Sequence, residues 1–483
     1  MVFSSAAFLF YFLPTVFLLY RFTSPRFRNV LLLLSSLFFY FWGEQWLVAM
    51  LLASILANYI LALIMANSNV FAECKPLEVG GKRNLRQKSA LGVALVINFG
   101  LLAIYKYSNF FVVDVFGEAL GVNASFFTNW QEIALPLGIS FYTFQALSYV
   151  FDVYGGVVPA TRNFVNLACY ITMFPQLVAG PIVRYSDIMA QLVRRTTSVD
   201  DFAEGARRFI LGLGKKVIIA DSMGQVADGI FSMPVENVLA SHAWLGIGAY
   251  TLQIYFDFSG YSDMAIGLGR MLGFHFLENF NYPYISRNIT EFWRRWHISL
   301  STWFRDYLYI PLGGNRAGRL RNLSNLWVVF LLCGLWHGAS WTFVIWGAYH
   351  GLFLVAEKAW LGNAIRRFPV VLQHSYAMLV VMIGWVIFRA DDMGHAGGML
   401  LSAFGFGAAS SSVYSFSYHL NGWALVTMVA GVVFCTPVSS VAGRYFSGRM
   451  GSFIRTAMLA GVLGISTIRI VADSFHPFLY FRF

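Results

Sequence analysis

The sequence predicts an all-α integral membrane protein, a polytopic bundle of about eleven to thirteen transmembrane and re-entrant helices. Only 12% of the 483 residues are charged and 58% are hydrophobic, which leaves too few charges to cover a soluble protein of this length. The longest apolar stretches match the roughly 20 residues that cross a bilayer. They lack the alternating pattern of outer-membrane barrel strands, so we expect helices, which satisfy their own backbone hydrogen bonds in lipid.

The first four predicted spans also give an orientation. They are Ala6–Tyr20, Val30–Trp42, Trp46–Met65 and a span from Leu91 to about Phe111. The loop after the third span is basic from Lys75 to Lys88, whereas the segment Asp114–Glu132 is acidic and contains no Lys or Arg. By the positive-inside rule, the basic loop lies in the cytoplasm and the N-terminus faces outward.

From Ala134 onward, Gly and Pro interrupt the apolar segments, at Leu135–Gly138, Phe174–Pro181 and Gly212–Lys216. Such residues are tolerated at membrane depth where helices break against other protein, so kinked or re-entrant pieces are expected there. Asp257 and Asp263 enter the next apolar run. Carboxylates inside a membrane need a partner, and we favour buried pairing with an arginine or with backbone donors over a direct chemical role.

The chain shows no internal repeat and no linker, which predicts one membrane domain over residues 1–483. Gly405–Ser417 is expected to be a loop, and the last spans are expected near Leu420–Cys435 and Ala457–Val471. The aromatic tail Phe475–Phe483 suits the membrane interface.

The net charge of +11 does not indicate nucleic acid, because the Lys and Arg residues gather at the ends of apolar segments. That distribution is typical of topology signals and of contact with anionic membrane lipids. The four cysteines are scattered without metal-ligand spacing, so no metal site is predicted.

The stretch from about residue 281 to residue 351 concentrates the residues that could do chemistry. It contains an arginine cluster and His297 within a predicted helix, Phe292–Phe304, that would suit the membrane interface. His337 lies in an almost uncharged run between Leu323 and Ala348. A buried imidazole is a natural general base for taking a proton from a hydroxyl. Cys333 precedes His337 by one helical turn, so a thiol–imidazole pair is a less favoured alternative.

Several motifs together resemble the membrane-bound O-acyltransferase family, and within it the bacterial branch that contains the alginate O-acetylation membrane protein. They are Phe292-Trp-Arg-Arg-Trp-His297, Arg305-Asp-Tyr-Leu-Tyr-Ile-Pro-Leu-Gly-Gly-Asn315 and Gly334-Leu-Trp-His337-Gly-Ala-Ser-Trp341, supported by Pro136–Gln145, Phe174–Pro181 and Gln253–Asp263. The resemblance implies helices around a central tunnel and assigns the family's two histidines to His337 and His297. We expect His337 to remove the proton of the acceptor and His297 to orient or polarise the reacting groups.

Further implications concern the substrates and their surroundings. The donor would be acetyl-CoA, used as a substrate with no tightly bound cofactor, and the protein would be a multi-pass protein of the bacterial inner membrane. A separate periplasmic O-acetyltransferase would place the acetyl groups on the polysaccharide, most simply alginate, with cellulose or peptidoglycan as alternatives. Candidate residues for binding the donor or acceptor are Arg294, Arg295, Arg305, Asp306, Asn315 and Trp336. The arginines suit the phosphates of coenzyme A and anionic lipid headgroups equally well.

The sequence alone leaves open two functions from other classes of protein. In a transporter or channel, His297, His337, Asp257 and Asp263 would line a proton or substrate pathway. In a non-catalytic scaffold of a polysaccharide secretion complex, neither histidine would be needed. Transporters often duplicate their spans, and no duplication is visible in this sequence.

Overall fold

The described residues form helices joined by loops and contain no β-strand, which confirms the predicted all-α class. This computed structural model describes residues 2–66, 75–119, 133–316, 318–407, 409, 414–438, 448–472, 478 and 479. Most of the acidic segment Asp114–Glu132, part of the loop Gly405–Ser417 and most of the tail Phe475–Phe483 lie outside this range.

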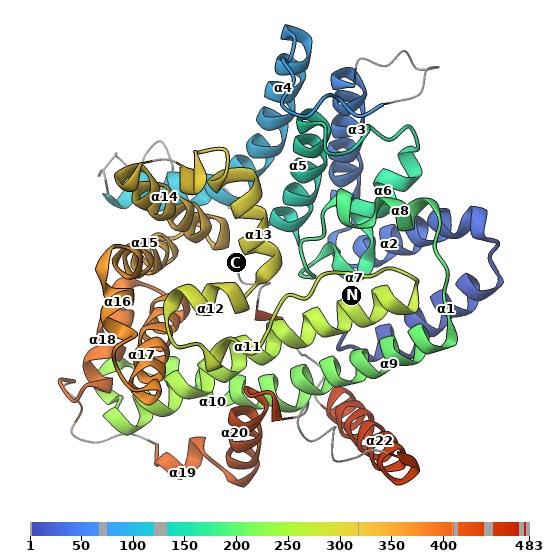
Figure 1. Ribbon diagram of the computed structural model, residues 1–483. Helices are drawn as coiled ribbons and strands as arrows, with labels where there is room; N and C mark the ends of the chain where they lie inside the picture. Colours follow the sequence, from blue (N-terminus) through green and yellow to red (C-terminus); the bar gives the residue numbers. More distant parts are fainter. Residues whose placement is uncertain are drawn as a thin grey trace. The chain divides into compact units, whose positions relative to one another are not determined.

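Figure 1 traces the helices in chain order. The α-helices are α1 Leu13–Phe22, α2 Arg28–Glu44, α3 Leu47–Met65, α4 Leu85–Leu102, α5 Ile139–Gly155, α6 Phe164–Thr172, α7 Phe174–Leu177, α8 Tyr185–Val193, α9 Val199–Gly214, α10 Asp221–Phe231, α11 Ala240–Met271, α12 Ile289–Arg295, α13 Ile298–Phe304, α14 Arg319–His337, α15 Trp341–Ala356, α16 Gly362–Ile365, α17 Val370–Arg389, α18 Met393–Ala403, α19 Phe416–His419, α20 Gly422–Phe434 and α22 Gly448–Ala472. Single-turn and π-type segments are η1 Phe8–Phe12, η2 Pro25–Phe27, η3 Ala103–Tyr107, η4 Phe110–Ala119, η6 Lys215–Ala220, η7 Val235–Asn237, η8 Pro283–Ile285, η9 Arg305–Tyr309, η10 Gly314–Arg316 and η11 Glu357–Leu361.

Within the described ranges, four helical segments are long and apolar enough to cross a membrane. They are Leu47–Met65, Leu85–Tyr107, Val370–Arg389 and Gly448–Ala472, and the shorter apolar helices are Phe8–Phe22 and Gly422–Phe434. The chain is therefore a membrane protein, as its composition predicts.

The Gly and Pro interruptions coincide with changes in the helices. Gly138 takes a left-handed conformation (φ 72°) immediately before α5, and α7 is a single turn that begins at Phe174. After Gly214, α9 gives way to the π-type segment η6. The breaks predicted at these three places are therefore confirmed.

The chain divides into two compact units, which we describe separately. Unit 1 comprises Met1–Ala206 and Ala265–Leu277, and unit 2 comprises Arg207–Met264 and Glu278–Phe483. The prediction of one membrane domain is not decided by this division and stays a prediction.

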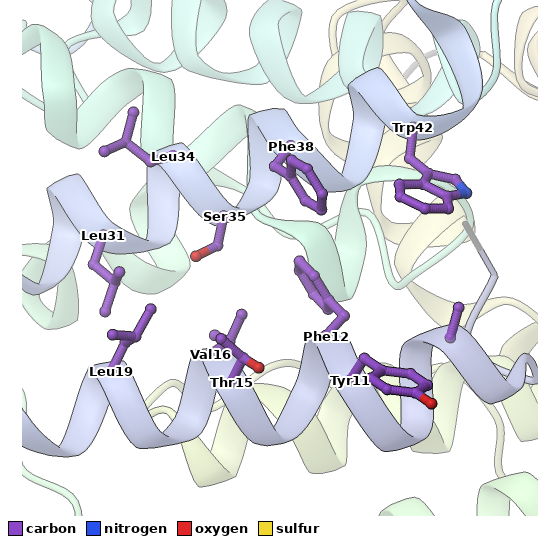
Figure 2. A pocket seen from close by; sticks show the side chains of 11 residues that line it. Tyr11, Phe12, Thr15, Val16, Leu19, Leu31, Leu34, Ser35, Phe38 and Trp42 are labelled. Atoms are coloured by element: carbon purple, nitrogen blue, oxygen red, sulfur yellow. The ribbon is translucent and has the colours of Figure 1, made fainter.

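Unit 1 contains a pocket of about 540 Å³ between η1–α1 and α2. Figure 2 shows that its walls are almost wholly apolar, with Leu19, Phe12, Phe38 and Trp42 among the lining side chains. None of its lining residues belongs to the stretch 281–351, and none is a group that could take a proton from a hydroxyl. This pocket is not the candidate active site.

Unit 2 contains the whole stretch 281–351. Its helices α14 and α15 form a tight pair, because Gly334 and Gly347 face each other and bring the two backbones together. A Cβ atom on Gly334 would lie 2.3 Å from the carbonyl oxygen of Phe343. This close packing fixes the end of α14, where His337 is the last residue.

Candidate active site

His297 lies between two short helices, so the single helix predicted over Phe292–Phe304 is wrong. α12 ends at Arg295, α13 begins at Ile298, and His297 has a left-handed backbone (φ 44°). The amide of Asn281 donates to the carbonyl of Arg295, and the amide of Ile298 donates to the carbonyl of Asn279, both at 2.9 Å. These two bonds tie the chain on either side of His297 to residues 279–281 and interrupt the helix.

Asn279 also fixes the protonation pattern of the His297 ring. Its side-chain oxygen lies 3.1 Å from Nδ1 of His297 and accepts from the amide and hydroxyl of Ser299 at 3.2 and 2.8 Å. Its side-chain nitrogen donates to Ser262 at 3.0 Å. Because the Ser299 amide requires an acceptor, the Asn279 oxygen must face the histidine. Nδ1 of His297 therefore carries the proton, and Nε2 presents a lone pair.

The surroundings of His297 keep the ring neutral. The side chain is fully buried, lies outside the candidate spans and packs against Phe258 with ring centroids 4.6 Å apart. Burial lowers the pKa of His297 from 6.5 to about 3, because the low-dielectric surroundings disfavour the imidazolium. Nε2 of His297 has no hydrogen-bond partner among the described residues.

His337 lies near the same tryptophan as His297. The ring of Trp336 is 6.1 Å from that of His297 and 4.9 Å from that of His337, measured between centroids. Trp346 and Phe388 also contact the His337 ring, at 5.1 and 5.3 Å. Both histidines are buried, with exposed fractions of 0% for His297 and 3% for His337. The structure therefore gathers His297, Trp336 and His337 in one aromatic environment.

The other predicted binding residues lie in different surroundings. Arg294 is exposed, and Arg295 pairs with Glu291 at 2.9 Å on the same helix. Arg305 and Asp306 pair with each other, with Nε and Oδ1 2.7 Å apart.

Asn315 belongs to a separate polar cluster beside the Gly313–Gly314 turn. Its side-chain oxygen accepts hydrogen bonds from Tyr309, Asn322 and Lys358 at 2.9, 3.2 and 3.1 Å. The roles predicted for Arg294, Arg295, Arg305, Asp306, Asn315 and Trp336 in binding stay predictions.

Asp257 and Asp263 are both paired, as the sequence predicts. Asp257 pairs with Lys216 at 2.7 Å and accepts from the amide of Leu479 at 2.7 Å. Asp263 accepts from Arg208 and Lys215 at 2.8 and 2.6 Å. These pairs occupy both carboxylates, which removes the main support for a pathway of carboxylates and histidines.

Sequence reasoning missed two residues of this site. Asn279 comes from a loop without helical periodicity, so no local pattern indicated its contact with His297. His350 is fully buried on α15, with its ring 5.1 Å from that of Trp293 and 5.0 Å from that of Trp346. The only sequence feature that pointed to His350 was that it is one of the three histidines between residues 281 and 351.

The arrangement suits proton transfer among closely packed aromatic rings. A neutral imidazole with a free lone pair can accept a proton or a hydrogen bond from a hydroxyl, and the apolar surroundings strengthen such interactions. An all-helical membrane protein with a buried, neutral His297 and a second buried histidine, His337, near the same tryptophan is suited to activating hydroxyl groups.

Comparisons with known proteins identify the family. The sequence profile of the membrane-bound O-acyltransferase family matches residues 159–391. A Pseudomonas putida protein named "Probable alginate O-acetylase" is 42% identical, with all of both chains covered. Its Pseudomonas aeruginosa counterpart is 48% identical over 84% of this chain and 75% of its own. A peptidoglycan O-acetyltransferase of Helicobacter pylori is 33% identical over 100% of this chain and 98% of its own. The chain belongs to the membrane-bound O-acyltransferase family, and it is an O-acyltransferase.

Proposed function

We propose that this O-acyltransferase moves acetyl groups from cytoplasmic acetyl-CoA across the bacterial inner membrane for O-acetylation of an extracellular polysaccharide, with alginate as the final acceptor. The observation that carries the proposal is that the rings of His297 and His337 both lie close to the ring of Trp336. The alginate relatives match the chain at 41 to 48% identity, above the 33% of the peptidoglycan relative, which favours alginate.

In the proposed reaction His337 removes the proton of an acceptor hydroxyl. The hydroxyl oxygen attacks the thioester carbonyl carbon, a C–O bond forms and the C–S bond breaks. The departing thiolate then receives the proton from His337, which returns to its starting state. The position of His337 at the carbonyl end of α14 favours the positive charge that the ring carries between these steps.

His297 has a different proposed role. Because its Nδ1 proton is committed to Asn279, a neutral His297 offers only the Nε2 lone pair to a substrate. It therefore accepts a hydrogen bond from a donor group on the acetyl donor or the acceptor. This orients a substrate and does not polarise the thioester carbonyl.

The proposed partners follow from the chemistry. Alginate lies outside the cytoplasm and the donor lies inside, and the helices of this family form a membrane domain. A separate periplasmic O-acetyltransferase completes the transfer to the polysaccharide, and membrane lipids surround the chain. The exposed arginines, Arg294 among them, bind the phosphates of acetyl-CoA.

Acetyl transfer in proteoliposomes tests the proposal. Purified native protein and His337→Ala, matched in thermal midpoint, are given radiolabelled acetyl-CoA with and without the periplasmic partner and alginate. We expect the native protein to transfer label from acetyl-CoA. The rate of transfer by His337→Ala should be lower by about 10²- to 10⁴-fold. Equal transfer by both proteins would show that His337 is not the base. If acetyl groups were transferred to peptidoglycan fragments in preference to alginate, the proposed acceptor would be peptidoglycan and not alginate.

A further inference from the structure

Glu357 is buried in unit 2 and faces the beginning of the helix that leads to His297. It is the first residue of η11, which continues α15, and only 8% of it is exposed. Its carboxylate accepts from the amides of Ile289 and Thr290 at 2.7 and 2.9 Å. The Thr290 hydroxyl donates to the same group at 2.6 Å. A carboxylate 67 and 68 residues away thus caps the first turn of α12.

The cap is complete. Asn288 accepts from the amide of Glu291 at 2.7 Å, so the first three amides of α12 all have acceptors. The negative charge of Glu357 also lies at the positive end of the helix dipole. Because α12 has only seven residues, it makes few internal hydrogen bonds, and a larger share of its stability depends on these external acceptors.

The same carboxylate connects α12 to two neighbouring helices. Glu357 extends from the end of α15, and Tyr376 on α17 donates its hydroxyl to the carboxylate at 3.1 Å. α15 follows α14 after the three residues Gly338–Ser340, and α14 ends at His337. Glu357 therefore links the helix before His297 to the helix pair that holds His337.

The contacts along α12 connect Glu357 at one end of the helix with His297 after the other end. The start of α12 meets Glu357, and Trp293 in its middle contacts His350 and Trp346 of α15, at 5.1 and 5.6 Å. After its end, His297 lies 6.1 Å from Trp336, beside His337. α12 thus lies along α15, and a shift along this axis would move His297 relative to His337.

We propose that Glu357 is a positioning residue that sets the register of α12 on α15 and thereby the placement of His297 against His337. The carboxylate does not touch the substrates. Its effect on catalysis rests on the proposed function, whereas its effect on the position of α12 does not.

The test combines a distance measurement with kinetics. Spin labels on Arg294→Cys and Leu352→Cys report the distance between α12 and α15, because both side chains are exposed. In Glu357→Ala we expect the width of the distance distribution to increase at least about twofold, because two of the first three amides of α12 lose their acceptor. Glu357→Gln keeps one acceptor oxygen and should give an intermediate width.

Kinetics are measured on unlabelled proteins with acetyl-CoA as the donor. Glu357→Ala should lower kcat about 10- to 100-fold while KM for acetyl-CoA changes less than about twofold, because the catalytic geometry changes and donor binding does not. Glu357→Gln should recover part of kcat. Glu236→Gln, an exposed carboxylate of unit 2, is the matched control and should match the native protein.

Each outcome decides the proposal. An unchanged distance distribution in Glu357→Ala overturns it, and so does a broadened distribution with native kcat. If the native protein transfers no acetyl, the proposed function fails, and the distance measurement alone decides whether Glu357 sets the position of α12. Should Glu357→Ala not fold, Thr290→Val, which removes one of the four donors, should show a smaller broadening and a smaller loss of kcat.

Discussion

The side-chain oxygen of Asn279 lies 3.1 Å from Nδ1 of His297, and this bond makes the two nitrogens of the histidine chemically different. Nδ1 carries the proton and is committed to the protein, whereas Nε2 keeps its lone pair for another partner. Two backbone hydrogen bonds, between Asn281 and Arg295 and between Ile298 and Asn279, hold the chain on both sides of His297 in its left-handed conformation.

Replacing Asn279 should therefore impair catalysis, and it should also lower the stability of the fold, because its buried side chain makes four hydrogen bonds. Asn279→Ala releases the His297 ring to adopt either tautomer. The hydrogen bond between Asn279 and His297 contributes about 1–3 kcal/mol, and loss of this energy in the transition state corresponds to a fall in kcat of roughly 10- to 100-fold. Acetyl transfer measured beside the exposed variant Asn363→Ala provides the comparison. Native kcat in Asn279→Ala would mean that the tautomer of His297 does not matter.

The stability of the protein should depend on pH through His297. The pKa of this ring is lowered to about 3 in the folded state, against 6.5 for a free histidine. Between these values the unfolded chain binds a proton that the folded chain excludes, so stability falls as the pH falls from about 6.5 towards 3. Between pH 7 and pH 5 this site should account for a loss of about 2 kcal/mol.

Chemical unfolding of the native protein and of His297→Gln at pH 7 and pH 5 measures this contribution. The variant should lose less stability on acidification, by about 2 kcal/mol, because all other titrating groups are common to both proteins. The same pH dependence in both proteins would show that His297 is not held neutral by its surroundings.

The close pair α14–α15 should be sensitive to a single methyl group. Gly334→Ala would place a Cβ atom 2.3 Å from the carbonyl oxygen of Phe343 and 3.1 Å from the Cα atom of Gly347. The helices must separate, at a cost of about 1–3 kcal/mol, and His337 three residues later must move with α14. We expect a lower thermal midpoint and a lower kcat.

Gly92→Ala on α4 is the matched control, since its Cβ atom would meet nothing within 4 Å. It should preserve kcat and change stability by at most about 1 kcal/mol. If Gly334→Ala behaved like Gly92→Ala, the close approach of α14 and α15 would not determine the position of His337.

The sequence predicted the parts of this protein that depend on local composition. Apolar length predicted helices, and Gly138, Phe174–Pro181 and Gly214 marked their interruptions, because these residues act on the backbone where they occur. The motifs around His297 and His337 indicated the two histidines that the structure places beside one tryptophan.

Residues that act across long stretches of chain were not predictable in this way. Asn279 reaches His297 over 18 residues, and Glu357 reaches Ile289 over 68 residues. Periodicity also gave a continuous helix through His297, because no local pattern reveals the backbone bonds to residues 279–281 that interrupt it. The tertiary contacts override the local preference there.

The buried pair Lys216–Asp257 should be among the most important ion pairs for stability. The two charges are 2.7 Å apart and only 5% and 2% exposed, and the second oxygen of Asp257 accepts from the amide of Leu479. Asp257→Ala would leave the buried ammonium with Asp221 and would remove the acceptor of the Leu479 amide. Removing one partner of such a pair typically costs about 3–5 kcal/mol.

Asp306→Ala is the control for this substitution, because it removes a carboxylate from a pair whose arginine is 59% exposed. It should change the free energy of unfolding by about 1 kcal/mol or less. Thermal unfolding in the same detergent compares the two variants. Phe478 packs against Phe258, which contacts His297, so displacement of Phe478 and Leu479 in Asp257→Ala should also lower acetyl transfer. Equal stability of the two variants would show that the Lys216–Asp257 pair and the hydrogen bond of the Leu479 amide contribute little.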